Sequence, residues 1–386
     1  MYISKKVPAL AMLYSSFLTM LDMSAFYDSE SLRQIFKLSG QGFLILSSIA
    51  VIFFGLGLGR QDRKKLFASI LLSLLLSLPF LGFFISQLFN DLSDALTPLI
   101  RLVASFFLIF ASTFLDKKTI HILLRHFSVI AVGLSLVGLL IFSFQLGDAE
   151  RFPVIMLKST KSIIFEQNLF SIILFLALFL VIDSRYYSPR VRLFVICLLL
   201  VGIFLSYFKT VIVLSAGYLS FRYARSFVSY IFLILPLCIL YYFIDDFLML
   251  TQVSENGLTS GRADLWYAAI SIWSNNMFFG IGEASIANEI LRYIQRTPPF
   301  TTFHNMFFDT LASSGLFGVG LLFSQFLVIF LQAKNNIYKI IFCMLPALFN
   351  SYFIAAPNLI GFFILLCVFN WSSGALNIFG RSYLKV

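Results

Sequence analysis

Charged side chains are scarce in this sequence, since only 12% of its 386 residues are Asp, Glu, Lys or Arg. A soluble domain carries roughly 25% charged residues, so the composition excludes an ordinary soluble protein. Hydrophobic residues make up 60% of the chain, and the mean hydropathy is +0.93. Apolar runs of about 18 residues or more recur from end to end, which is the length that a membrane-spanning helix requires. The composition therefore indicates a membrane protein.

Motifs for nucleotides and metals are missing as well. The sequence contains neither a GxxxxGK[ST] phosphate-binding loop nor an HExxH zinc motif. It has no exposed acidic pair with the DxD-like spacing of a sugar-nucleotide and metal site. The few cysteines all lie in apolar runs without ligand spacing: Cys197, Cys238, Cys343 and Cys367. We interpret them as small apolar side chains and expect no metal and no cofactor.

The apolar runs are continuous, which favours helices over the alternating strands of a membrane β-barrel. Met1–Met23 lacks the small-residue cleavage site of a signal peptide and predicts a first span instead. We predict an all-α, polytopic membrane bundle of about 12 transmembrane helices. Near residues 206–221, two short spans can also be read as one. The predicted spans are residues 7–23, 41–59, 66–85, 99–115, 127–147, 167–184, 193–208, 210–222, 227–243, 306–332, 339–355 and 359–378.

Positive charge is concentrated in alternate connections between these spans, and the net charge is +10. Lysine and arginine accumulate in cytoplasmic loops, so this distribution predicts that both termini are cytoplasmic. It also explains the excess charge better than nucleic-acid binding does, and we expect no nucleic-acid partner. The basic clusters are Lys5–Lys6, Arg60–Lys65, Lys117–Arg125, Arg185–Arg192, Arg222–Arg225, Lys334–Lys339 and Arg381–Lys385.

One long polar segment, Asp245–Thr302, interrupts the apolar runs on the opposite side. It divides the chain into spans in 1–244, a loop in 245–305 and further spans in 306–386. Within this loop, Ser260 suits a helix N-cap and Asp264 suits the first turn. Apolar residues then follow at helical spacing, which predicts an amphipathic helix on the outer membrane surface. They are Leu265, Trp266, Ala269, Ile272, Trp273 and Met277.

Two residues of the loop 245–305 are candidates for catalysis. Arg262 lies at a predicted helix N-terminus, where the free backbone N–H groups also attract anions. Its alternative is a structural pairing with Asp264 or a lipid phosphate. His304 lies where the loop meets the next span, and histidine can act as a general base near neutral pH. A histidine that only packs at the membrane interface is the alternative.

Several further cations lie on the predicted outer side, where topology does not favour them. They either pair with Asp148, Glu150 and Glu166 or bind an anionic, lipid-linked substrate. Lys209 lies deep in the apolar run LSYFKTVIV, where a charge is costly unless the lysine reaches the interface. Asp309 lies within a span, where it has a buried partner or faces the bundle. The outer cations are Arg151, Lys158, Lys161, Lys209, Arg292 and Arg296, and Arg101 lies within a span.

Three segments in this order carry a resemblance to a known family: SGRADLW, FFGIGEAS and FHNMFFDTLASSGLFG. The sequence resembles the bacterial O-antigen polymerase/ligase superfamily, which contains Wzy-type polymerases and WaaL-type ligases. His304 and Asn305, followed by nine residues and Gly315, match the family's His-Asn-spacer-Gly pattern. The resemblance extends over residues 151–320 and includes FEQNLFSIIL with its central Asn168. Lys209 replaces the family's usual arginine, which keeps the charge but loses the bidentate fork.

The resemblance implies a GT-C-like glycosyltransferase of the bacterial inner membrane that uses neither a metal nor a nucleotide sugar. Its donor would be a glycan on undecaprenyl diphosphate at the periplasmic face. Arg262 would stabilise the leaving diphosphate, and His304 would accept the proton of an acceptor hydroxyl. The implied partners are membrane lipids, a chain-length regulator and a flippase. Further candidates for binding the diphosphate or the glycan are Lys209, Arg151, Lys158, Lys161, Asn168, Glu283, Arg292 and Asn305.

Three classes of function stay open at this point: a glycosyltransferase (polymerase or ligase), a flippase and a structural scaffold. A polymerase, which the compact SGRADLW segment favours, would transfer the glycan to another lipid-linked repeat unit, whereas a ligase would transfer it to lipid A–core. A flippase would place its ionisable residues within the spans, whereas most outer-side ionisable residues here lie in loops, with Arg101, Lys209 and Asp309 as the exceptions. A secondary transporter would favour broken helices in matched halves, which the sequence does not show. A structural scaffold would tolerate changes at His304 and Arg262.

Overall fold

The computed structural model describes residues 6–20, 30–57, 63–92, 94–145, 167–183, 187–206, 208–223, 262–294, 302–332, 336–348 and 356–371. Every regular element within these ranges is a helix, which confirms the all-α prediction. The helices belong to two compact units, which we describe one at a time. The first unit comprises residues 1–20, 35–123 and 262–386, and the second comprises residues 21–34 and 124–261. The predicted division at 244 and 305 stays a prediction about topology.

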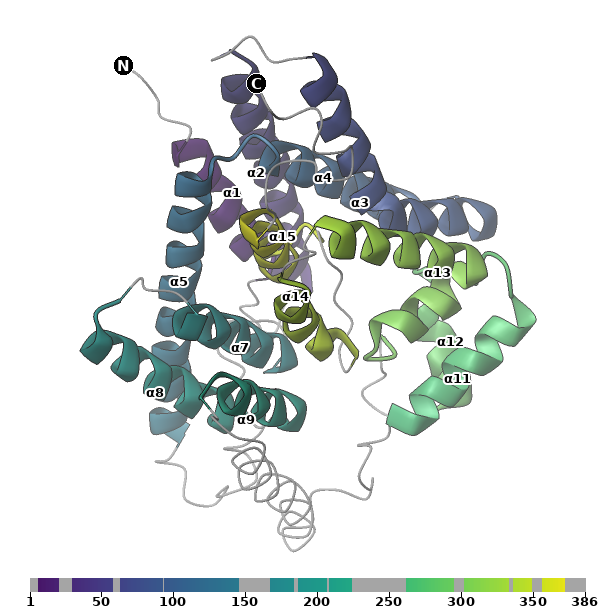
Figure 1. The fold of residues 1–386 in the computed structure, drawn as a ribbon. Coiled ribbons are helices and arrows are strands. Elements are labelled where there is room, and N and C mark those ends of the chain that lie inside the picture. The colour runs from purple at the N-terminus through teal and green to yellow at the C-terminus, as the bar shows by residue number, and fades with distance from the viewer. Residues whose placement is uncertain are drawn as a thin grey trace, which may run out of the picture. The chain divides into compact units, whose positions relative to one another are not determined.

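The first unit holds the candidate site. Its helices are α1 (Lys6–Leu18), most of α2 (Glu30–Gly57), α3 (Arg63–Asn90), α4 (Leu96–Ser112), α11 (Arg262–Asn275), α12 (Ile286–Tyr293), α13 (Met306–Gln332), α14 (Ile337–Met344), the 3-10 helix η3 (Leu345–Leu348) and α15 (Leu359–Trp371). Helix α3 packs against both α4 and α13, although α13 lies more than two hundred residues later in the chain (Figure 1). Helix α11 packs on α13.

Small residues and one polar side chain hold α3 against α13. A Cβ added to Gly82 of α3 would lie 3.2 Å from Cα of Gly318 on α13, so the two backbones approach closely. Small residues at such crossings are typical of membrane helices. Near Pro79, which lies inside α3, the carbonyl of Leu76 accepts a hydrogen bond from Nε2 of Gln325 (2.5 Å). Helices α3 and α13 are therefore closely packed, and both contribute residues to the candidate site.

The second unit contains most of α5 (Lys117–Gln145) together with α7 (Gln167–Asp183), α8 (Pro189–Leu205) and α9 (Lys209–Tyr223). Helix α7 is apolar apart from Ser171 and its two ends, and it is buried from Phe170 to Ile182, as expected for a helix that is hydrophobic all round. It packs on α8 and α9. Helix α8 ends at Leu205 and α9 begins at Lys209, so the two short spans predicted around residues 206–221 are separate helices.

Among the described residues, four helical segments are long and apolar enough to cross a membrane: 35–56, 66–90, 117–140 and 306–332. Five shorter apolar helices cover 96–112, 168–183, 210–222, 337–347 and 359–370. The chain is thus a multi-pass membrane protein by length and composition of its helices. The total of about 12 spans and the side on which the termini lie stay predictions. The predicted span at 227–243 lies outside the described residues.

Candidate functional site

Helix α13 is broken in its first half. Gly315 has φ of 61° and ψ of −158°, which no helical residue adopts, so 306–314 and 316–332 are two helical pieces joined at this residue. The uninterrupted span predicted for 306–332 is therefore divided in the structure. A break inside an apolar helix leaves backbone N–H and C=O groups without their helical partners, and such groups need other partners when buried.

The segment 277–282, which follows α11, supplies those partners. Two N–H groups of this segment donate to carbonyls at the end of the first helical piece. Two of its carbonyls accept from N–H groups at the start of the second piece. The four bonds are Ile281 to Ala312 (3.0 Å), Gly282 to Ser313 (3.0 Å), Leu316 to Met277 (2.8 Å) and Phe317 to Phe278 (3.1 Å). The break is consequently a built feature with its backbone groups satisfied.

Glycine is required where the segment meets the break. A Cβ at Gly315 would lie 2.5 Å from the carbonyl carbon and oxygen of Phe278, and a Cβ at Gly280 would lie 2.5 Å from the carbonyl oxygen of Ala312. Both glycines have positive φ, 61° and 64°, which disfavours any residue with a side chain. The positive φ and the lack of room for a Cβ therefore explain why a glycine, Gly315, ends the His-Asn-spacer-Gly pattern.

Side chains at the end of α3 also form hydrogen bonds to the segment 277–282 and to the break in α13. The hydroxyl of Ser86 donates to the carbonyl of Ser313 (2.5 Å) and also contacts the carbonyl of Phe279. Nδ2 of Asn90 donates to the carbonyl of Gly280 (3.2 Å). These polar side chains were not among the predicted site residues, and their sequence signal is a spacing of four residues near the end of α3.

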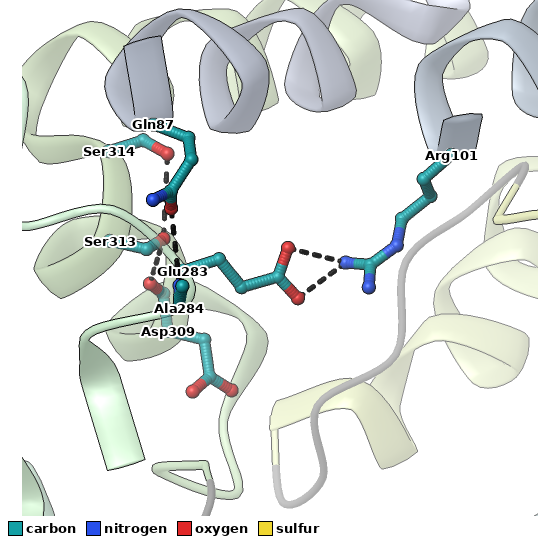
Figure 2. Close-up of polar contacts among 7 residues, drawn as sticks. All are labelled: Gln87, Arg101, Glu283, Ala284, Asp309, Ser313 and Ser314. Carbon is teal, nitrogen blue, oxygen red and sulfur yellow. Dashed lines mark hydrogen bonds and ion pairs between the residues drawn. The ribbon is translucent and has the colours of Figure 1, made fainter. Parts of the chain in front are cut away.

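Glu283 extends from this fastened segment toward α4, where it meets Arg101 (Figure 2). Nη1 of Arg101 lies 2.5 Å from Oε1 and 2.7 Å from Oε2 of Glu283. The side chains are 18% and 33% exposed, so the pair is partly withdrawn from solvent. Next to it, the backbone N–H of Ala284 donates to Oε1 of Gln87 (3.2 Å). Glu283 was predicted as a site residue, whereas Arg101 was only noted as a charge within a span.

His304 lies two residues before α13, which begins at Met306. Its φ of 51° makes it the non-glycine residue with positive φ among those described. The residue before it is fixed because the N–H of Phe303 donates to Oδ1 of Asp309 (2.8 Å). The residue after it is fixed because Oδ1 of Asn305 accepts from the N–H groups of Phe307 (2.8 Å) and Phe308 (3.2 Å). Asn305 thus caps α13. Of the two alternatives for Asp309, a buried partner or a side chain that faces the bundle, the structure shows a buried partner, the N–H of Phe303.

The apolar stripe of helix α11 packs against residues that adjoin Glu283 and His304 in the sequence. Leu265, Ala269 and Ile272 are buried in one cluster that also contains Ile281 and Phe303. The predicted helix is therefore confirmed, whereas its apolar face, which was expected at the outer membrane surface, packs inside the protein. Trp266 of the same helix stacks on Phe308 of α13, with ring centroids 5.5 Å apart. The cluster ties the segment after α11, the residue before His304 and the helix that begins at Arg262 into one body.

The remaining predicted residues are distributed as follows. Helix α11 begins at Arg262 and α9 begins at Lys209, but the side chains of both lie outside the described part of the chain. Arg292, on the short helix α12, forms an exposed ion pair with Glu289. Asn168 lies in the first turn of α7, in the second unit. The candidates outside the described residues are Arg151, Lys158 and Lys161.

Within the described ranges, no three His, Cys, Asp or Glu side chains lie together in a way that suits a metal ion. The cysteines that the structure describes, Cys197, Cys343 and Cys367, are free thiols. At the site the structure pairs Arg101 with Glu283, and the carboxylate of Asp309 in the same unit accepts from the backbone N–H of Phe303.

Residues 163–323 match the protein-family model described as O-Antigen ligase. This match confirms the predicted resemblance to the O-antigen polymerase/ligase superfamily over that part of the chain. The matched region contains the segment 277–284, His304, Asn305 and Gly315, whereas Arg101 and the end of α3 lie before it. No curated protein matches the chain in a sequence comparison.

Proposed function

We propose that this protein is a membrane glycosyltransferase that polymerises a surface polysaccharide. It transfers a glycan chain from undecaprenyl diphosphate to a repeat unit on a second undecaprenyl diphosphate at the periplasmic face of the inner membrane. The family match supports a substrate that is a lipid-linked oligosaccharide. The observation that carries the proposal is the conformation of His304, held at positive φ between two anchored neighbours.

The strain at His304 suggests a reason for its placement. A non-glycine residue in the left-handed region costs about 1–3 kcal/mol, and such residues cluster at functional sites. Here Asp309 holds the residue before it and the Asn305 cap holds the residue after it, so the local fold maintains the costly conformation. A histidine fixed in this way suits a group that must meet a reacting hydroxyl in one orientation.

The proposed reaction is a direct displacement. An acceptor sugar hydroxyl forms a new bond to the anomeric carbon of the donor glycan, and His304 accepts its proton. The bond between that carbon and the diphosphate oxygen breaks, and the electron pair leaves with the diphosphate. Cations must offset the charge that develops there. Arg262 at the start of α11 is the first candidate, and Lys209 and Arg151 are the next.

The broken helix α13 supports the same location. Irregular backbone at membrane depth is tolerated where it lies inside the protein or borders a cavity, and it often marks binding sites. In this chain the break at Gly315 lies in the same helix that Asn305 caps and that carries Asp309. Asn305 and Glu283 are therefore proposed to position the sugar or the histidine, in addition to their structural bonds.

An O-antigen ligase is the second candidate, because the matching family model carries that description. A ligase would use the same donor and the same proton acceptor but would transfer the glycan to lipid A–core. The residues on the donor side therefore do not separate the two reactions. The acceptor does, and the acceptor is what the experiment must identify.

The test is a surface-glycan gel from a strain that lacks this gene, complemented with wild type, His304→Ala or Arg262→Ala at equal membrane abundance. Lipid A–core that carries a single repeat unit, with the ladder absent, supports the polymerase and places both residues in its site. Bare core together with accumulated lipid-linked polymer identifies a ligase. A normal ladder from both variants contradicts the catalytic assignment and favours a flippase or a scaffold. His126→Ala, on the predicted cytoplasmic side, is the matched control and should leave the ladder intact.

A further inference from the structure

We propose that Arg101 is a further binding residue for the diphosphate of the lipid-linked donor, and that Glu283 positions its guanidinium group. The proposal rests on the proposed function, because that function supplies a diphosphate lipid as substrate. Arg101 lies outside the region that matches the family model, so the match assigns it no role.

The position of Arg101 in α4 is costly. Arg101 is the charged residue in the sequence LTPLIRLVASFFLIFAS, whose other residues are apolar or small and polar. A charge in an apolar span is expensive and usually marks a functional group with a partner. Its side chain is only 18% exposed, so it does not simply extend into solvent. Glu283 compensates part of this cost.

The geometry of the pair leaves much of the guanidinium group available. Both carboxylate oxygens of Glu283 contact the same nitrogen, Nη1 (2.5 and 2.7 Å), instead of two nitrogens as in a bidentate pair. A guanidinium group carries five N–H donors. Within the described part of the chain, the N–H groups of Nε and Nη2 make no hydrogen bond. They present a fork that suits two oxygens of a phosphate.

Glu283 is anchored well enough to act as a positioning residue. The neighbouring Ala284 N–H donates to Gln87 (3.2 Å), and the Gly282 N–H donates to Ser313 (3.0 Å), so bonds to α3 and α13 flank Glu283. Figure 2 shows its side chain reaching from this segment to Arg101. The position of Nη1 is therefore restrained before any ligand arrives, which reduces the entropy lost on binding.

The pair also belongs to the body that carries the proposed catalytic residues. Ile281, two residues before Glu283, packs in the same buried cluster as Leu265 and Phe303. Leu265 lies one turn after Arg262, and Phe303 directly precedes His304. The segment that holds Glu283 is thus connected through packing to both of them. An additional cation here would share the charge of the diphosphate with Arg262.

The alternative is an ion pair that only fastens the segment 277–284 to α4. A charge swap separates the two roles. Arg101→Glu combined with Glu283→Arg keeps an ion pair between α4 and the segment but removes the cation from α4. A fastening role predicts that the swap restores both thermal stability and ligand binding, whereas a binding role predicts that it restores stability alone.

The experiment measures binding of farnesyl diphosphate to the purified full-length protein in detergent by microscale thermophoresis. Farnesol, which lacks the diphosphate, and inorganic pyrophosphate, which lacks the lipid, show which part of the ligand is recognised. We expect the swap to melt near wild type but to weaken farnesyl diphosphate binding about tenfold or more, with Arg101→Lys between the two. Arg222→Ala removes an exposed arginine from its pair with Asp183 in the second unit and is the matched control.

Wild-type affinity in the swap variant would overturn the proposal, as would a wild-type protein that does not distinguish farnesyl diphosphate from farnesol. If the swap variant and the single variants Arg101→Glu and Glu283→Arg all fail to fold, Arg101→Lys decides: it must fold and bind farnesyl diphosphate more weakly than wild type. The proposed function fails separately, when wild type binds the diphosphate lipid but the glycan gel shows no dependence on the protein.

Discussion

The backbone N–H of Phe303 donates to Oδ1 of Asp309 over 2.8 Å, and this bond fixes the residue that directly precedes His304. Asp309 is 6% exposed, so its carboxylate is held inside the protein. A buried acceptor that loses its donor, or a donor that loses its acceptor, costs about 1–3 kcal/mol. The conformation of His304 therefore depends on a carboxylate five residues later in the chain.

Replacement of Asp309 tests this dependence. We expect Asp309→Ala to lower the melting temperature in detergent and to abolish glycan polymerisation, because the N–H of Phe303 is left without its acceptor. Asp309→Asn keeps an oxygen at the same place and should retain most of the stability and part of the activity. Wild-type stability and a full ladder in Asp309→Ala would show that the bond does not support His304.

Asn305 offers a second test, which separates capping from sugar binding. Loss of an N-cap costs typically about 1 kcal/mol, so Asn305→Ala should destabilise the protein by that order. Asn305→Asp keeps the capping oxygen for Phe307 and Phe308 and should restore the melting temperature. If Asn305→Asp also restores activity, the role is capping alone; a stable but inactive Asn305→Asp variant supports contact with the sugar. A stable Asn305→Ala would contradict the cap itself.

Gly315 provides the sharpest test of the broken helix. Gly315→Ala adds a Cβ 2.5 Å from the backbone of Phe278 at a residue with φ of 61°, so we expect a loss of several kcal/mol and little folded protein. Gly320→Ala in the same helix meets nothing within 4 Å and should be neutral or stabilising by up to about 1 kcal/mol. Fluorescence-detected size exclusion reports the folded fraction of each. Equal behaviour of the two variants would mean that the break at Gly315 is wrong.

Ser86 tests the attachment of the segment 277–282 to α3. Its hydroxyl donates to the carbonyl of Ser313 and is fully buried. Ser86→Ala removes this donor with almost no change of volume, and we expect a loss of about 1 kcal/mol and faster cleavage of the segment in limited proteolysis. Ser324→Ala, whose hydroxyl bonds within its own helix at an exposed position, is the control. An unchanged cleavage rate in Ser86→Ala would argue against the attachment.

Much of the helical framework was predictable, because its signal is local. Continuous apolar runs predict helices wherever they occur, and the stripe that includes Leu265, Ala269 and Ile272 predicted α11, although its apolar face was expected at the membrane surface and is buried inside the protein. The motif with His304 and Asn305 led to the junction where the structure shows a strained residue and a cap. These features depend on residues that lie within one or two helical turns of each other.

The parts that could not be predicted depend on distant residues. The break at Gly315 exists because a segment about thirty-five residues earlier supplies its backbone partners, and a glycine in an apolar run carries no sign of that. The pairing of Arg101 with Glu283 joins residues 182 positions apart. Sequence patterns identify that Arg101 is costly in α4 but do not name the residue that compensates it.

We propose above that this protein extends a lipid-linked glycan with His304 as the proton acceptor. The most direct measurement gives the purified protein in liposomes a single substrate, undecaprenyl-diphosphate-linked repeat units, and follows the products by mass spectrometry. The proposed polymerase reaction, with His304 as the proton acceptor, predicts a ladder of lipid-linked polymers and free undecaprenyl diphosphate with wild type, and neither product with His304→Ala. Extension by His304→Ala at the wild-type rate, or transfer that occurs only when lipid A–core is added, would contradict it.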